Sequence, residues 1–148
     1  MVCLGNICRS PMAEGILKKK TGELGLAIHV DSAGTGGWHA GEHPDRRAIR
    51  TAKKFGIDIS KSVARKFTIK DFEDFDRIVV MDLANLRDVQ SMARTEADMQ
   101  KIQMLLEPGN GGIAREVPDP WYGGEDGFIE VFQLMDSACD ALVKSLMS

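Results

Sequence analysis

The 148-residue chain lacks any apolar run of the about eighteen residues that a membrane-spanning helix needs, and it lacks a charged-then-apolar leader. It also lacks a basic excess, because 19 Lys and Arg against 22 Asp and Glu give a formal charge of -3. These absences argue against membrane insertion and against nucleic acid as the main partner. We therefore expect a cytoplasmic protein that attracts any anionic substrate locally.

Repeats, low-complexity tracts and linker-like runs of Gly, Ser or Pro are also absent. The length and the 43% of hydrophobic residues suit one core, so we expect a single domain over residues 1–148. There are only three cysteines, an odd number that does not suit a secreted disulfide framework. Two of them, Cys3 and Cys8, share one short segment with a glycine, which is more typical of a reactive thiol.

Patterns of strands alternate with patterns of helices along the chain. The first helix is expected to start with Ser10 as N-cap and Pro11 in its first turn, and Gly56 suits the end of the second helix. Helices are expected over 10–22, 45–55, 83–92 and 128–146, strands over 27–33, 77–81 and 102–106, and a Pro- and Gly-rich loop over 107–124. This alternation predicts an α/β protein with one doubly wound parallel sheet of about four strands, flanked by helices.

The strongest chemical signal is the segment Cys3-Leu4-Gly5-Asn6-Ile7-Cys8-Arg9-Ser10, which ends at the first residue of the predicted helix over 10–22. This segment is called the phosphate loop below. A loop of this length can turn its backbone N–H groups inward, and the helix start adds a partial positive charge. Arg9 can grip two phosphate oxygens bidentately, and the same positive field favours a thiolate at Cys3. We expect phosphate to bind to Leu4, Gly5, Asn6, Ile7, Cys8 and Arg9.

A carboxylic acid that could protonate a leaving oxygen is expected in the segment 117–122. This segment and the two glycines after it, residues 117–124, are called the acid segment below. Asp119 lies there between two prolines, which restrict its backbone and keep its carboxyl aimed. The alternative is an ordinary solvated Asp in a surface turn. Trp121 and Tyr122 follow at once, and their flat rings suit a substrate whose leaving group is a phenol.

The chain resembles the low-molecular-weight protein tyrosine phosphatases over essentially its whole length. The likeness rests on the phosphate loop, Ser32-Ala33-Gly34-Thr35, Trp38, Met81-Asp82 with Asn85-Leu86-Arg87-Asp88, and Asp119-Pro120-Trp121-Tyr122. The resemblance implies a phosphatase I-like fold. It also implies hydrolysis of phosphotyrosine monoesters on protein substrates without a cofactor or a metal.

The resemblance further implies the chemical role of each catalytic residue. Cys3 would attack phosphorus and form a cysteinyl-phosphate, while Arg9 stabilises the equatorial oxygens. Ser10 would hydrogen-bond the sulfur as it leaves, and Asp119 would act as acid and then as base. Phosphate, sulfate or vanadate would bind as anions in the same site. The protein would be a monomer or a weak dimer.

Supporting roles follow from the same resemblance. Asn6 and Ser32 would hold the left-handed turn of the phosphate loop. Cys8 is either a small buried hydrophobe or, as the family favours, a thiol that captures oxidised Cys3 in a reversible disulfide. The walls of the substrate site would be Leu4, Trp38, Trp121 and Tyr122, with Trp38 in a core as the alternative.

Rival functions on this fold are weighed by single residues. Arsenate reduction needs relay cysteines, and none occurs between Asp82 and Leu106; an arginine phosphatase would carry threonine where Ile7 stands. A protein of a different class, one that binds phosphate without catalysis, is also an alternative. The reason is that only Met1 and Val2 precede Cys3, which leaves little room for a first strand. We expect this strand to be nearly absent, so that either the chain begins late or another segment supports the phosphate loop.

Overall fold

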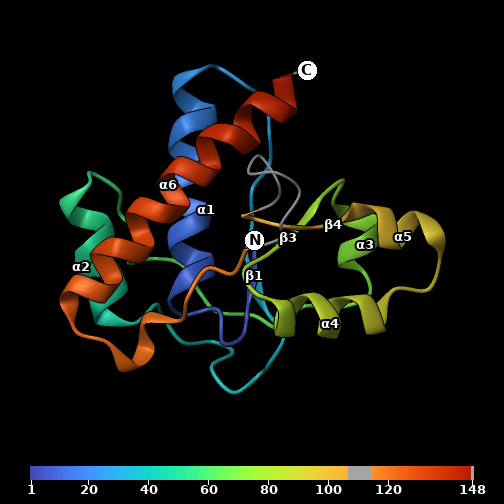
Figure 1. Cartoon of the computed structure of the whole chain (residues 1–148), viewed down its shortest axis with the longest axis horizontal. Coiled ribbons are helices and arrows are strands. Elements are labelled where there is room, and N and C mark those ends of the chain that lie inside the picture. The colour runs from blue at the N-terminus through green and yellow to red at the C-terminus, as the bar shows by residue number, and fades with distance from the viewer. Residues whose placement is uncertain (107–114, 148) are drawn as a thin grey trace.

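The computed structural model describes residues 1–106 and 115–147 and contains a four-stranded parallel sheet (Figure 1). The strands are β1 (Val2–Cys3), β2 (Ala33–Gly34), β3 (Ile78–Val80) and β4 (Ile102–Met104), and their order in the sheet is β2-β1-β3-β4. Consecutive parallel strands require crossover connections, and helices supply them. The predicted α/β fold with about four parallel strands is therefore confirmed.

Two groups of helices cover the sheet (Figure 1). One group is α1 (Arg9–Glu23), α2 (Arg46–Lys54) and the C-terminal α6 (Glu125–Met147). The other is α3 (Asp71–Asp74), α4 (Leu83–Met92) and α5 (Glu96–Lys101), and a short 3-10 turn, η1 (Pro120–Tyr122), precedes α6. No helix in the described ranges is both long and apolar enough to cross a bilayer.

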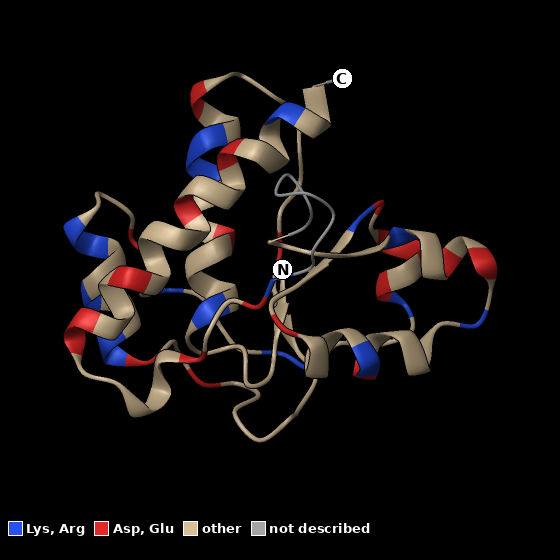
Figure 2. Cartoon of the chain, in the orientation of Figure 1, with Lys and Arg blue, Asp and Glu red and all other residues tan. Residues whose placement is uncertain are grey.

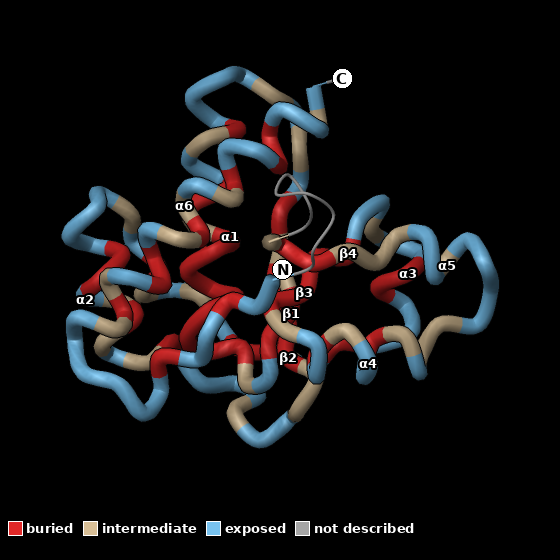
Figure 3. The backbone as a smooth tube through the Cα atoms, viewed as in Figure 1, coloured by how far each residue is buried: buried red, intermediate tan, exposed pale blue. Residues whose placement is uncertain are grey.

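The core has two halves because side chains alternate across the sheet. Figure 3 shows the central strands coloured as buried, with buried segments in the helices beside them. Ile78 and Val80 pack with Phe67, Phe72 and neighbours on the α3–α4 side. Their neighbours Val79 and Met81 face α1, α2 and α6. The helix expected over 128–146 is present as part of α6, and its apolar stripe is buried there as Phe128, Val131, Phe132, Met135, Cys139 and Leu142.

β1 is as short as expected, yet it occupies the centre of the sheet. Val2 pairs with Ala33 on one side and with Val80 on the other. The carbonyl of Cys3 accepts a hydrogen bond from the amide of Thr35 at 2.9 Å. These bonds tie the start of the phosphate loop to both neighbouring strands, so two residues are enough to carry it.

The expected strand over 27–33 is wrong except at its end, because β2 comprises only Ala33 and Gly34. The pairing of Val2 with Ala33 leaves residues 27–32 beyond the end of β1, without a neighbouring strand in the described part of the chain. The six-residue α5 was not anticipated, because its charged sequence has no apolar face. Of the expected loop over 107–124, residues 107–114 lie outside the described residues.

Candidate active site

The phosphate loop runs from the end of β1 into the start of α1, and its polar atoms converge on one sulfur. The Sγ of Cys3 lies 3.0 Å from the Oγ of Ser10, and the amide of Asn6 donates to it at 3.3 Å. Ser10 was expected to cap α1, but α1 begins at Arg9 and Cys8 holds the N-cap position. The expectation is wrong because the Ser10 hydroxyl is engaged by the loop and not by the helix amides.

A network of side chains holds the loop in shape around Asn6, whose φ of 57° is left-handed. Its side-chain amide donates to the Oγ of Ser10 at 2.7 Å and to the Oγ of Ser32 at 3.0 Å, while its carbonyl oxygen accepts from the amide of Arg65 at 3.0 Å. Ser32 in turn donates to the carboxylate of Glu14 at 2.5 Å. Asn6 and Ser32 are therefore brought together as expected, whereas Glu14 and Arg65 carried no recognisable signal in the sequence.

Arg9 is only 3% exposed and joins the phosphate loop to two other segments. Its Nη1 donates to Asp82 at 2.7 Å and to the carbonyl of Val117 at 2.9 Å, and its Nη2 lies 3.8 Å from the carboxylate of Asp119. Asp82 also caps α4 by accepting from the amide of Asn85 at 2.7 Å. Because Asp82 directly follows the predicted strand over 77–81, we expected it either to be structural or to help position the loops, and its bonds to Asn85 and Arg9 do both.

Asp119 and the four expected wall residues surround a cavity of about 260 Å³. The Oδ1 of Asp119 accepts from the amide of Trp121 at 3.0 Å, its Oδ2 faces Arg9, and the side chain stays 43% exposed. Trp38 is 72% exposed and Tyr122 94% exposed, so neither belongs to a core. The cavity is lined by Cys3, Leu4, Gly5, Ile7, Cys8, Arg9, Trp38, His39, Asp119, Trp121 and Tyr122.

His39 and Gly34 were not expected at the site. A Cβ on Gly5 would lie 3.0 Å from the His39 ring, so that ring covers the phosphate loop, and it also faces Trp121 at 6.3 Å between centroids. A Cβ on Gly34 would lie 2.8 Å from the carbonyl oxygen of Leu4. In the sequence, the one indication that this strand approaches the phosphate loop closely was the glycine that follows the predicted strand over 27–33.

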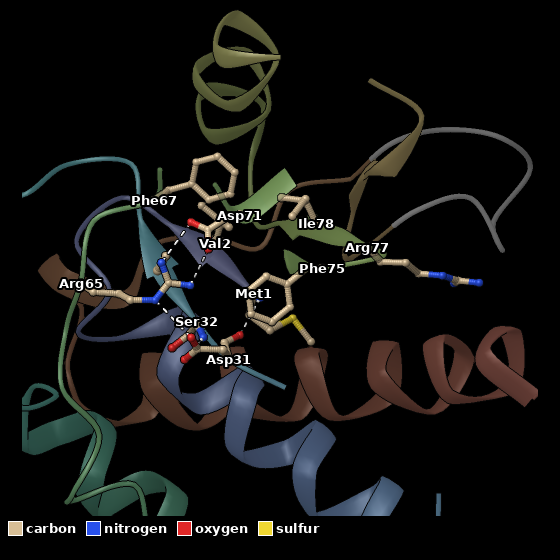
Figure 4. A pocket seen from close by; sticks show the side chains of 11 residues that line it. Met1, Val2, Asp31, Ser32, Arg65, Phe67, Asp71, Phe75, Arg77 and Ile78 are labelled. Carbon is tan, nitrogen blue, oxygen red and sulfur yellow. Dashed lines mark hydrogen bonds and ion pairs between the residues drawn. The ribbon is translucent and has the colours of Figure 1, made fainter. Parts of the chain in front are cut away.

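A second cavity lies at the other end of β1 (Figure 4). Arg65 spans it, bonded to Asp31 at 3.1 Å and to both oxygens of Asp71 at 3.0 Å. Its volume of about 30 Å³ suits a single water and not a substrate. These ion pairs fix Arg65, and the backbone amide of that residue then holds Asn6.

All three cysteines are free thiols and buried. Burial, with the nearby charge of Asp45 as the next contribution, raises the pKa of Cys8 above its ordinary value. A disulfide between Cys3 and Cys8 stays a prediction. Cys139 lies in the buried stripe of α6, and burial raises its pKa to about 12.

The thiol of Cys3, the guanidinium of Arg9 and the carboxyl group of Asp119 thus line one cavity at the carboxyl edge of a parallel sheet. This is the geometry of a cysteine-dependent phosphatase, in which the thiol attacks phosphorus and the carboxyl group serves the leaving oxygen. The chain belongs to the low molecular weight phosphotyrosine protein phosphatase family, whose model matches residues 1–148.

Known proteins agree with this assignment in sequence and in structure. A low molecular weight phosphotyrosine protein phosphatase of Schizosaccharomyces pombe is 42% identical over 91% of this chain and 88% of its own length. A protein tyrosine phosphatase of Entamoeba histolytica, solved with Hepes in its active site, matches with a TM-score of 0.91 and 38% identity over 99% of this chain and 94% of that one. Wzb of Vibrio vulnificus, solved with benzylphosphonate, matches with a TM-score of 0.86 and 28% identity over 97% and 94%.

Proposed function

We propose that the chain, as one domain over residues 1–148, hydrolyses phosphotyrosine in proteins through a cysteinyl-phosphate on Cys3. The observation that carries the proposal is the convergence of Cys3, Arg9 and Asp119 on the same cavity. A loop that merely bound phosphate would need neither the buried sulfur at its base nor a carboxyl group on the opposite wall.

In the first step the Cys3 sulfur forms a bond to phosphorus while the bond from phosphorus to the phenolic oxygen breaks. Asp119 transfers its proton to that oxygen, so that a neutral phenol leaves. Nη1 of Arg9 donates to Asp82 and Val117, while Nη2 lies 3.8 Å from the Asp119 carboxylate and would turn to the phosphoryl oxygens. Its role is to stabilise charge that is spread over the equatorial oxygens.

In the second step a water molecule attacks the cysteinyl-phosphate and the sulfur leaves as a thiolate. Asp119, now a carboxylate, accepts the proton of that water, and orthophosphate is released. Ser10 lies 3.0 Å from the sulfur and donates its hydroxyl proton in a hydrogen bond to the departing thiolate. Asn6 holds Ser10 in this position at 2.7 Å.

The walls of the cavity favour an aryl phosphate over its rivals. Trp38, Trp121 and Tyr122 offer flat surfaces on which a phenol ring can stack. The benzylphosphonate complex of Vibrio vulnificus Wzb supports the same ligand class. Ile7 lines the cavity at the position where an arginine phosphatase would have threonine, which argues against that activity. The sequence has no cysteine between Asp82 and Leu106, where arsenate reduction would need its relay cysteines.

The cellular location, the binding partners and the oligomeric state that we propose are those expected from the sequence. Three free cysteines suit a reducing compartment, which supports a cytoplasmic location. The partner is a phosphotyrosine-containing protein, and phosphate, sulfate and vanadate compete for the phosphate loop. The chain acts as a monomer or weak dimer, which analytical ultracentrifugation at several concentrations would decide.

The test of this function uses two single variants and two classes of ester. Cys3→Ser should be inactive on p-nitrophenyl phosphate while still binding inorganic phosphate in a calorimeter. Asp119→Ala should lose about 10²- to 10⁴-fold in kcat/KM with phenyl phosphate, and far less with 2,4-dinitrophenyl phosphate, whose phenolate leaves without a proton. Wild-type activity in Cys3→Ser would overturn the proposal, and a phosphoarginine peptide hydrolysed faster than a phosphotyrosine peptide would redirect it.

A further inference from the structure

Arg47, in the first turn of α2, contacts the acid segment through two hydrogen bonds and a ring, although the two are far apart in the sequence. Its Nη1 donates to the carbonyl of Trp121 at 2.9 Å and to the carbonyl of Gly123 at 3.3 Å. Its guanidinium also lies over two rings, at 5.3 Å from the centroid of Trp121 and 4.7 Å from that of Phe128. One cation therefore holds the backbone on the C-terminal side of Asp119 at two points.

Asp45 orients this guanidinium. Its Oδ1 accepts from Nε of Arg47 at 3.1 Å and its Oδ2 accepts from Nη2 at 3.2 Å, which is a bidentate pair. The planar fork of Arg fits two carboxylate oxygens and still presents Nη1 to the acid segment, a geometry that Lys cannot reproduce. Burial alone would raise the pKa of Asp45, but the hydrogen bonds from Arg47 lower it, so Asp45 stays charged.

Asp45 is at the same time attached to the phosphate loop, because its amide donates to the carbonyl of Ile7 at 2.8 Å. A continuous path therefore leads from the phosphate loop through Asp45 and Arg47 to the carbonyls of Trp121 and Gly123. Figure 2 shows the cationic helix α2 beside the start of α6, to which the acid segment leads. Arg47 is 74 and 76 residues away from the two residues that it holds, and this path links the phosphate loop to the acid segment in addition to the bond from Arg9 to Val117.

We propose that Asp45 and Arg47 form a clasp that positions the proton donor Asp119 over the phosphate loop. Both are positioning residues, since they act through the backbone of the acid segment and not on the substrate. The inference rests on the proposed function, because it is useful to catalysis only if Asp119 is the acid. It has a physical motive: Asp119 is 43% exposed, and a misplacement of about 1 Å can lower a rate by about 10²-fold.

A purely structural role predicts a different pattern of kinetic effects. If Arg47 only joined α2 to α6, its loss would lower activity equally for every ester, in proportion to the folded fraction. If it positions Asp119, the loss should depend on how much the leaving group needs a proton. The dependence on leaving group therefore separates the two interpretations.

The kinetic test compares Arg47→Met with Arg46→Met, which removes the exposed cation one position earlier in the same helix. Arg47→Met should lower kcat/KM for phenyl phosphate by roughly tenfold or more, and for 2,4-dinitrophenyl phosphate by about twofold at most. Arg46→Met should match the wild type with both esters. An equal fall with both esters in Arg47→Met, or no fall with either, would overturn the clasp.

A second variant guards against damage to α2. Asp45 caps this helix by accepting from the amide of Arg47 at 2.8 Å, and Asp45→Ser keeps a good N-cap while removing the bidentate partner. It should show the same selective loss with phenyl phosphate, at a smaller magnitude. Wild-type selectivity in this variant would contradict the role assigned to Asp45.

Hydrogen exchange provides a measurement that does not depend on activity. In Arg47→Met, amides of the acid segment should exchange about tenfold faster than in the wild type, while those of α1 should be unchanged. Unchanged exchange in the acid segment would sink the inference. If the wild type hydrolysed neither ester, the proposed function would fail, and the exchange comparison would still decide whether the clasp holds the segment.

Discussion

At the scale of single residues, the site depends on Asn6. Its backbone is left-handed, which asparagine tolerates better than most residues, and its side chain bonds three different segments. The two properties can be separated by substitution. Glycine accepts the backbone angle but loses the hydrogen bonds, whereas alanine loses both.

We expect Asn6→Gly to lower the free energy of unfolding by about 1–3 kcal/mol, because buried hydrogen bonds are lost. Asn6→Ala should be less stable than Asn6→Gly by a further 1–2 kcal/mol or so, since a Cβ opposes the left-handed angle. Urea unfolding of the three proteins measures both differences. Equal stability of the two variants would show that the backbone angle carries no strain.

The role of Asp82 could not be assigned from the sequence, because it depends on an ion pair with a distant residue. The sequence places Asp82 directly after a predicted buried strand, which left a structural role and a role in positioning the loops both open. The ion pair at 2.7 Å with Arg9 joins residues 73 positions apart, and no local pattern encodes such a separation. The same holds for Glu14, which reaches the phosphate loop only through Ser32.

At the scale of elements, β2 shows how a two-residue strand can position the phosphate loop. Gly34 approaches that loop so closely that a Cβ would lie 2.8 Å from the carbonyl of Leu4 and 3.1 Å from the amide of Asn6. Both neighbours are backbone atoms, which cannot rotate away as a flexible side chain could. A side chain at Gly34 must therefore move the phosphate loop or the strand.

We expect Gly34→Ala to lower the free energy of unfolding by about 1–3 kcal/mol through overpacking, and to raise KM or lower kcat by disturbing the phosphate loop. Gly22→Ala is the matched control, because Gly22 lies in α1 with open space around it. This control should gain about 0.5–1 kcal/mol with unchanged kinetics. Thermal unfolding and p-nitrophenyl phosphate kinetics on both proteins check the pair, and a neutral Gly34→Ala would contradict the close approach.

Helix α6 connects the element scale to the whole molecule. Its apolar stripe packs against α1 and α2 and forms part of one core half, far along the sequence from the phosphate loop that this core supports. Met135 is completely buried in that stripe, while Gln133 lies on the exposed face of the same helix. The site residues themselves come from the end of β1, the start of α1 and the segments that follow the strands at the carboxyl edge of the sheet.

At the scale of the whole molecule, we expect Met135→Ala to lower the free energy of unfolding by about 2–5 kcal/mol, because a cavity remains in the core. Gln133→Ala should change it by about 0.5 kcal/mol at most. Well below the unfolding temperature, Met135→Ala should keep the wild-type kcat, since no site residue moves. Denaturant unfolding with parallel kinetics tests this, and a selective loss of kcat would mean that α6 acts on the site directly.

The sequence by itself determined the chemistry and the order of elements. The phosphate loop, the acid segment, the buried strand at 77–81 and the stripe of α6 are local patterns, in which spacing and residue type suffice. For this reason the family, the parallel sheet and the convergence of Cys3 with Asp119 on one cavity were all within its reach.

Only the tertiary structure decided how these parts are held together. The register of β1 against β2 limits the second strand to Ala33 and Gly34, and the Ser10 hydroxyl serves a sulfur instead of capping α1. The contacts of Asp82 with Arg9 and of Arg47 with the acid segment join residues more than seventy positions apart. Such pairs depend on the packing of whole elements, and packing is a property of the folded chain that local patterns do not contain.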